Sequence, residues 1–409
     1  MEVGVRALVR PSLSVLLVSF VAGGILLGTI SGLTPGLHAN TFAALAVGVA
    51  PAIPGPTAGV ALAILAAGTV HTFLDVVPAL AFGVPDAAMA PTALPGHRLV
   101  IAGRGREGLR LSALGSGLAV AFAVPLSVPV TALMRRIVPV AYAHLPIVLG
   151  GVAAMLVLTE SSRRAAVGAA LAVAASGGLG VVALDLSVSG LLGNGTVLTP
   201  LFSGLFGAPV LLDALDGGGV PGQSGTAVTT SRRTVVELAL IGTCAGAVVS
   251  YLPGVSSAVA ATAALLGTRG GGPRQFLVTT SAVNTATAVF ALFSLVALNA
   301  PHTGVTVALG ALSPRPPLSW LVATVVVAAT VGFLAVPVAG DRYLRMAGAV
   351  DYGRVSLGLL GLLVVLSGVV AGPVGVGLFA AATVVGSIPP LFGARRSALM
   401  GVLLVPLAL

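Results

Sequence analysis

Apolar runs recur along the whole chain, and this pattern restricts the fold more than any other feature. A helix needs about 20 consecutive apolar residues to cross the hydrocarbon core of a bilayer. Runs of that size occupy residues 111–133, 138–158, 164–184, 276–298, 318–339 and 355–371. Only 8% of the residues are charged and 57% are hydrophobic, and these proportions exclude the soluble globular classes. We therefore expect an all-α polytopic protein that crosses the cell membrane many times.

The charged residues are mostly basic, and their distribution suits a membrane protein. All 20 basic residues are arginines, and the net charge is +9. They are scattered in short segments without aromatic partners for base stacking, so we expect no nucleic-acid partner. Short cytoplasmic loops of membrane proteins collect arginines. This rule predicts that the N-terminus and residues 98–110, interpreted as a solvated loop, lie in the cytoplasm, with the Arg135-Arg136 pair across the bilayer.

Two apolar runs are interrupted by a Pro-Gly pair beside small polar residues. The first break lies in GTISGLTPGLHANT, residues 28–41, and the second in GTCAGAVVSYLPGVSSA, residues 242–258. A broken helix frees backbone groups that lipid cannot satisfy, so such breaks lie inside protein or face a watery cavity. Broken helices, or re-entrant hairpins, at matching positions of two repeats are typical of a transport site near mid-membrane. The alternative is a plain turn between two full crossings.

Residues beside the two breaks are therefore candidates for substrate binding. Helix N-termini that follow the breaks would direct partial positive charge and free N–H groups at an anion. The alternative for the polar members is helix capping. Capping explains His38 least well, because an imidazole can carry a proton near neutral pH. The candidates are Thr34, Pro35, Gly36, His38, Asn40, Thr41, Pro253, Gly254, Ser256 and Ser257.

The breaks belong to a wider duplication of the sequence. Further matches in the same order pair residues 70–75 with 283–288 and residues 200–202 with 390–392. We therefore predict two membrane repeats, 11–215 and 235–409, joined by an aqueous linker at 216–234 that is rich in Gly, Pro, Ser and Thr. An odd number of crossings in each would invert the second repeat, and the two breaks would then meet near the middle of the membrane.

Polar residues within two matched apolar runs are candidates for ion coupling. His71 and Asp75 share one face of a helix, because they are four residues apart. A carboxylate inside a membrane segment is costly and is a functional hypothesis by default. With Thr72, the pair would relay H⁺ or coordinate Na⁺. Asn284 and Thr285 hold the matching place in the second repeat. The alternatives are a loop at the membrane edge for the first group and interhelical hydrogen bonding for the second.

Several segments resemble a known family of transporters. GLTPGLHAN at residues 32–40, GLFG at 204–207 and PPLFGARRSALMGVLLVP at 389–406 resemble the TctA-like family, named for the large membrane subunit of tripartite tricarboxylate transporters, and its archaeal branch in particular. The resemblance implies a secondary transporter driven by an ion gradient, with two re-entrant hairpins at the substrate. It also implies a small membrane subunit and an extracytoplasmic binding protein as partners. His38 and Asn40 replace a Gly/Ala-rich stretch, which favours a substrate other than a tricarboxylate.

Three functions agree with these patterns. We favour an ion-gradient-driven secondary transporter of a small solute, an organic anion such as a carboxylate, that works by alternating access at a mid-membrane site. The alternatives are a passive channel or facilitator and an intramembrane enzyme that acts on a lipid. We expect no enzymatic activity, because the common soluble enzyme motifs are missing from the sequence. We expect no cofactor or bound metal beyond Na⁺ or H⁺ as coupling ion. The oligomeric state stays open, with a homo-oligomer among the options.

Overall fold

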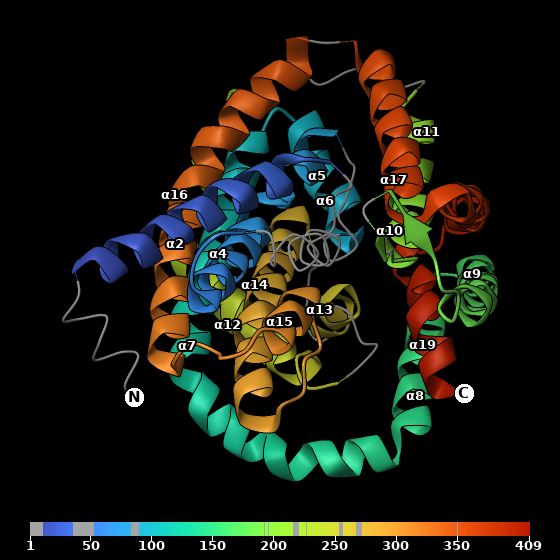
Figure 1. Cartoon of the computed structure of the whole chain (residues 1–409). Coiled ribbons are helices and arrows are strands. Elements are labelled where there is room, and N and C mark those ends of the chain that lie inside the picture. The colour runs from blue at the N-terminus through green and yellow to red at the C-terminus, as the bar shows by residue number, and fades with distance from the viewer. Residues whose placement is uncertain are drawn as a thin grey trace.

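The chain is almost entirely α-helical in the residues that the computed structural model describes (Figure 1). These residues are 11–35, 53–82, 90–191, 193–194, 196–215, 221–225, 227–252, 257–266, 272–349 and 351–409. Within them, 7 helical segments are long and apolar enough to cross a membrane. Two short strands, β1 (Ser189–Gly190) and β2 (Gly193–Asn194), pair antiparallel. The expected all-α polytopic membrane fold is therefore confirmed.

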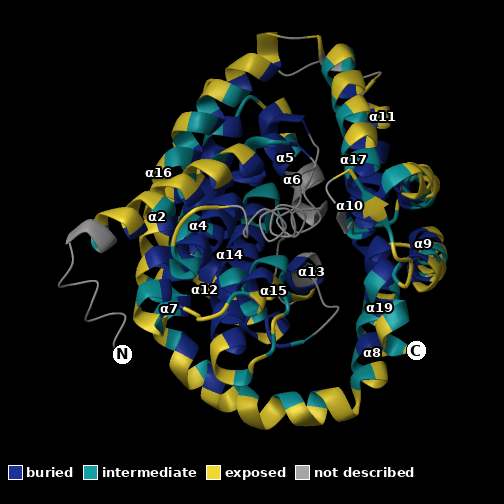
Figure 2. Cartoon of the chain, viewed as in Figure 1, coloured by how far each residue is buried: buried dark blue, intermediate teal, exposed yellow. Residues whose placement is uncertain are grey.

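Most helices pack into a large group that we call the first bundle. It consists of α2 (Pro11–Leu33), α4 (Thr57–Leu74), α5 (Val76–Phe82), α6 (Ala90–Ile101), α7 (Gly105–Ala143), α12 (Arg232–Val249), α13 (Ser257–Leu266), α14 (Pro273–Leu298), α15 (Gly304–Ala311) and α16 (Leu318–Ala349). The segments Thr57–Phe82 and Pro273–Leu298 are its centre, since 94% and 72% of their apolar windows are buried. Figure 2 shows the outer faces of α2, α7 and α16 exposed around them. Polar residues on α4 and α14 are thus shielded from lipid.

The remaining elements form a second bundle with its own apolar core. It consists of α8 (Leu145–Leu158), α9 (Arg163–Ala183), α10 (Leu198–Phe202), the π-helix η3 (Ser203–Gly207), α11 (Ala208–Ala214), α17 (Tyr352–Gly386), α18 (Ile388–Phe392), the 3₁₀-helix η4 (Arg396–Met400) and α19 (Gly401–Ala408). The bundles lie side by side, with α7 leading into α8 along one edge and α16 and α17 converging at the opposite edge (Figure 1). Each unit predicted from the sequence contributes helices to both bundles. The repeat itself stays a prediction.

Two boundaries expected from the sequence are wrong. The apolar run 138–158 is not one span, because α7 continues to Ala143 and α8 begins at Leu145. Pro146 opens the new helix, where its missing N–H costs no hydrogen bond. Residues 98–110 are not a solvated loop either, because α6 extends to Ile101 and α7 begins at Gly105. Arg135 and Arg136 consequently lie within the long helix α7 and not beyond its end.

The long helix α17 breaks at Gly372, where the predicted apolar run 355–371 ends. Gly372 has a φ of 63°, a left-handed conformation that favours glycine, and Pro373 follows it. A break of this kind leaves backbone carbonyls without helical donors. The N–H of Leu191, beside the short β1–β2 hairpin, donates to the carbonyl of Val369 at 2.9 Å. The hairpin therefore satisfies part of the broken helix.

Candidate functional site

A cluster of buried polar side chains lies where α2, α4 and α14 meet. The amide Nδ2 of Asn284 donates to Oδ2 of Asp75 at 2.7 Å, and the two residues are only 7% and 3% exposed. The hydroxyls of Thr72 on α4 and Thr285 on α14 lie 3.4 Å apart. A buried carboxylate is tolerated only when polar groups surround it. We call His71, Thr72, Asp75, Asn284 and Thr285, together with Ser31, the polar cluster.

His71 extends the polar cluster to α2. Its ring nitrogen Nδ1 lies 3.0 Å from the hydroxyl of Ser31, and the two side chains are buried. Ser31 is a residue that the sequence analysis missed. It precedes the first Pro-Gly break by four residues, so the cluster begins one helical turn from that break. The polar cluster thus links α2, which ends just before the first Pro-Gly pair, to the central helices.

The end of α4 places Asp75 beside its partner. Asp75 follows the last residue of α4, and its N–H donates to the carbonyl of His71 at 2.9 Å. A new helix, α5, begins at Val76, so the chain changes direction at the carboxylate. His71 and Asp75 are therefore one helical turn apart, as their spacing of four residues predicted. Asp75 lies at a junction between two helices, deep inside the first bundle.

Close contact between α2 and α4 brings Ser31 to His71. Glycines recur on α2 at positions 24, 28 and 32. A Cβ added at Gly28 would lie 2.7 Å from the Cα of Ala67 on α4, so only glycine permits this approach. Small residues spaced by four commonly allow membrane helices to pack at short distance. The backbone of α2 therefore lies directly against α4, and the side chain of Ser31 reaches the ring of His71.

The same packing recurs between α12 and α14, which precede and follow the second break. A Cβ at Gly242 would lie 2.6 Å from the carbonyl oxygen of Thr279, and one at Gly246 would lie 2.9 Å from that of Val283. Asn284 follows directly on α14. In each case, glycines on the helix that precedes a Pro-Gly break (α2 or α12) allow close contact with the helix that carries buried polar residues (α4 or α14).

The residues predicted to bind substrate are described only in part. The helix α2 ends at Leu33, and the hydroxyl of Tyr343 donates to the Leu33 carbonyl at 3.1 Å. Thr34 and Pro35 follow, with Pro35 buried, and Ser257 is the buried first residue of α13. Helices therefore end before the first break and begin after the second. The candidates Gly36, His38, Asn40, Thr41, Pro253, Gly254 and Ser256 lie outside the described residues.

Glu107 holds a separate buried ionic network at the start of α7. Its side chain is fully buried. It accepts from Arg104 at 2.6 Å, from Arg274 at 3.0 and 3.1 Å, and from the N–H and hydroxyl of Thr229 at 2.9 and 2.7 Å. This network joins α7, α14 and the segment before α12. Glu107 was expected in a solvated loop, which is wrong, because residues distant in the sequence enclose it.

The second bundle contains a buried arginine that sequence reasoning missed. Arg396 begins η4 and is 8% exposed, and its Nη2 donates to Oδ2 of Asp213 at 2.9 Å. Its other terminal nitrogen, Nη1, is buried and has no hydrogen-bond partner among the residues that the structure describes. The sequence signal was the Arg395-Arg396 pair within an otherwise apolar C-terminal segment.

Arg396 lies near the contact between the two bundles. The helix η4 contacts α13, the helix that follows the second break, and also contacts α6. Val259 of α13 belongs to the apolar core of the second bundle, together with Leu399 and Met400. The helix that begins with Arg396 therefore lies against the helix that begins at Ser257.

The chemistry of the described residues suits a weakly bound ion better than a resident transition metal. The structure groups no three His, Cys, Asp or Glu side chains at metal-binding distance within the part of the chain that it describes. The polar cluster instead combines one carboxylate with an amide, hydroxyls and an imidazole. Carboxylate, carbonyl and hydroxyl oxygens suit hard cations, and an imidazole beside a carboxylate suits proton exchange.

Comparison with known proteins identifies the family. The model of the Tripartite tricarboxylate transporter TctA family matches residues 18–401. The chain belongs to this family. A TctA family chain whose described residues include 7 membrane-length helices is a multi-pass membrane protein with a role in transport. An uncharacterised protein of the archaeon Methanocaldococcus jannaschii is 26% identical over 313 residues, which cover 76% of this chain and 77% of that protein. No solved structure matches the chain.

The match confirms the resemblance drawn from the sequence, including its archaeal branch. The family region includes the polar cluster, the first break, the second break and Arg396. These features therefore belong to the body of the transporter and not to an appended segment.

Proposed function

We propose that this chain is a secondary transporter that uses an ion gradient to move a small organic anion, such as a carboxylate. The observation that carries the proposal is the buried pair of Asp75 and Asn284 between the two central helices α4 and α14. Ionisable groups inside a membrane bundle are costly and mark ion pathways. A chain that only packed its helices would gain more from apolar residues at these positions.

The polar cluster serves as the coupling site in this proposal. Asp75 carries the charge, and Thr72, Asn284 and Thr285 supply the surrounding oxygens and the amide. The coupling ion is a monovalent cation, Na⁺ or H⁺, and His71 with Ser31 provides a proton partner in the second case. Binding of the cation neutralises the cluster, so that the loaded bundle can cross the low-dielectric interior at lower electrostatic cost.

The substrate anion binds beside the two breaks. The N-terminus of α13 carries partial positive charge, which favours an anion. Arg396 supplies a full positive charge from the second bundle, and its buried Nη1 would gain an acceptor from the anion. Arginine binds carboxylates through two parallel hydrogen bonds. The residues of the breaks, 34–41 and 253–257, complete the site.

In the proposed mechanism, the helices around this site rearrange so that the site opens to one side of the membrane and then to the other. The matched glycine contacts of α2 on α4 and of α12 on α14 support the predicted duplication, because each contact joins a helix that precedes a break to a helix that carries residues of the polar cluster. The family description names a tripartite system. We therefore also infer a small membrane subunit and an extracytoplasmic binding protein as partners.

Uptake by purified protein in vesicles tests this function. The chain is reconstituted, and accumulation of a panel of labelled mono-, di- and tricarboxylates is followed with an inward Na⁺ gradient, an inward H⁺ gradient, or neither. The proposal predicts accumulation above the outside concentration that stops when an ionophore collapses the gradient. Equilibration to equal concentrations, with no dependence on either gradient, would instead identify a passive facilitator. Chemical conversion of a reconstituted lipid would identify the enzyme alternative.

A further inference from the structure

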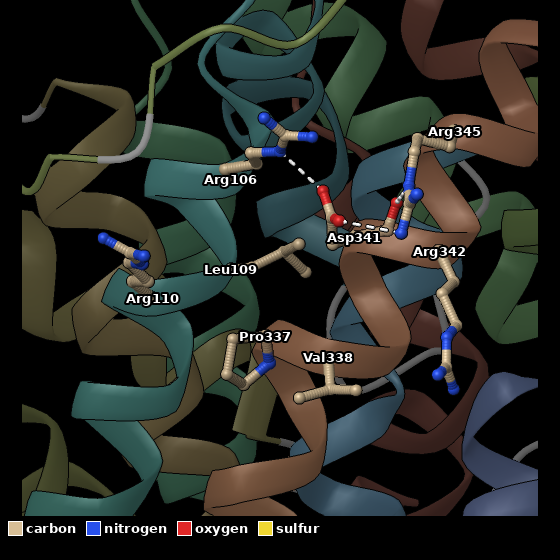
Figure 3. A pocket seen from close by; sticks show the side chains of 8 residues that line it. All are labelled: Arg106, Leu109, Arg110, Pro337, Val338, Asp341, Arg342 and Arg345. Carbon is tan, nitrogen blue, oxygen red and sulfur yellow. Dashed lines mark hydrogen bonds and ion pairs between the residues drawn. The ribbon is translucent and has the colours of Figure 1, made fainter.

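A basic pocket lies between α7 and α16, away from the polar cluster. It has a volume of about 530 Å³. Figure 3 shows its lining, which consists of arginines from both helices, a single acidic residue and three apolar residues. The lining residues are Arg106, Leu109, Arg110, Pro337, Val338, Asp341, Arg342 and Arg345. None of these residues takes part in the proposed transport site.

The pocket has an excess of positive charge. Asp341 pairs with Arg106 and with Arg345, the second at a distance of 3.1 Å. Arg342 extends away from Asp341 (Figure 3), and its guanidinium forms no hydrogen bond or ion pair within the described part of the chain. The lining thus carries one carboxylate and four guanidinium groups, and two of these pair with the carboxylate. The pocket is therefore built to attract an anion, and arginine recognises phosphate groups in particular.

An exposed apolar stripe on α16 leads to these arginines. Val327, Leu334 and Val338 are 50%, 61% and 55% exposed, and Val331 is also exposed. Their spacing of three and four residues places them on one face of the helix. The next positions on that face are Arg342 and Arg345. The stripe therefore runs from the lipid-facing middle of α16 to its basic end.

We propose that the basic pocket binds the phosphate headgroup of an anionic membrane lipid, with the acyl chains lying along the apolar stripe of α16. A free anion would not contact the apolar stripe, whereas a lipid would pair its phosphate with the arginines and cover the apolar surface with its acyl chains. Basic pockets between membrane helices suit such headgroups. The bound lipid bridges α7 and α16, which are the helices that lead from the first bundle into the second. Its site lies near the end of α16, from which the chain enters α17 of the second bundle.

Lipid retention measured by native mass spectrometry tests this proposal. The protein is prepared with equal amounts of phosphatidylglycerol and phosphatidylcholine, as wild type and as the double variant Arg110→Gln/Arg342→Gln. The control is Arg233→Gln/Arg354→Gln, which removes two arginines that are 90% and 88% exposed outside the pocket. We expect the pocket variant to bind phosphatidylglycerol roughly thirtyfold more weakly, as for loss of two arginines near an anionic lipid surface, and the control to bind as wild type does.

A second measurement separates the lipid from a soluble anion. Thermal unfolding is recorded in phosphatidylcholine vesicles, in vesicles that also contain phosphatidylglycerol, and in phosphatidylcholine with inorganic phosphate. We expect phosphatidylglycerol alone to stabilise the wild type, and Arg342→Gln to lose part of that stabilisation while unfolding as wild type does in phosphatidylcholine. Equal phosphatidylglycerol binding by the pocket and control variants would overturn the proposal. Equal stabilisation by inorganic phosphate would also overturn it, and would indicate a soluble anion.

Discussion

Replacing Gly28 with alanine tests the packing that assembles the polar cluster. The added Cβ would lie 2.7 Å from the Cα of Ala67 and would overlap the Ala67 carbonyl. Carbon atoms pack favourably at about 3.5–4.0 Å, so α2 and α4 must separate by roughly 0.8 Å. Overpacking of this kind costs about 1–3 kcal/mol. The higher helix propensity of alanine offsets up to about 1 kcal/mol of this cost. We therefore expect a net destabilisation of about 1 kcal/mol.

Equilibrium unfolding in mixed micelles measures this change, and Gly23→Ala provides its control. Gly23 lies on the same helix, but a Cβ there has nothing within 4 Å. Gly23→Ala should leave the free energy of unfolding unchanged or slightly raised. Gly28→Ala should also weaken transport, since it moves Ser31 away from His71. If the two variants unfold alike and transport alike, close packing of α2 on α4 does not position the cluster.

Three further predictions concern the ionic groups. Glu107→Gln should lower the free energy of unfolding by about 3 kcal/mol, because hydrogen bonds to charged groups are worth roughly 1.5–3 kcal/mol and Arg274 loses its counter-charge; an unfolding curve like that of the wild type would show that the network is dispensable. Burial lowers the pKa of His97 below 6.5, so the unfolded chain takes up its proton first, and stability should fall as the pH drops below about 6.5. That loss should shrink in His97→Gln, and an identical pH profile of unfolding for both proteins would contradict the assignment. Arg396→Lys keeps the charge but loses the planar fork, so it should weaken substrate binding about tenfold in a titration with the transported anion, whereas unchanged affinity would remove Arg396 from the site.

The sequence predicts the class of fold because bilayer thickness sets a length that apolar runs must meet. It predicts the helical face of His71 and Asp75 because helical periodicity is local. It could not locate the junction at His144, since apolar content is the same on both sides of that residue. A helix break there depends on local backbone geometry and not on hydropathy.

Other features of the site could not be predicted because they depend on residues that lie far apart in the sequence. Glu107 is enclosed by Thr229 and Arg274, which are 122 and 167 residues away. The charged residues from Arg98 onward therefore resembled a solvated loop in the sequence, where these distant partners cannot be seen. Ser31 was missed for the same reason, although the glycines at 24, 28 and 32 indicated a close helical neighbour. Asp75 and Asn284 were both found from sequence, yet their hydrogen bond required the fold.

The most direct test of the account is gradient-driven accumulation by Asp75→Asn. Asparagine has the shape of aspartate and can still bond with Asn284, but it carries no charge. The control is Glu237→Gln, which changes a carboxylate that is 55% exposed. The account predicts that Asp75→Asn still exchanges labelled substrate across the vesicle membrane but accumulates it only to a ratio of one, while Glu237→Gln accumulates it as the wild type does. An accumulation ratio in Asp75→Asn equal to that of the wild type would contradict the central claim that Asp75 couples the ion to the substrate.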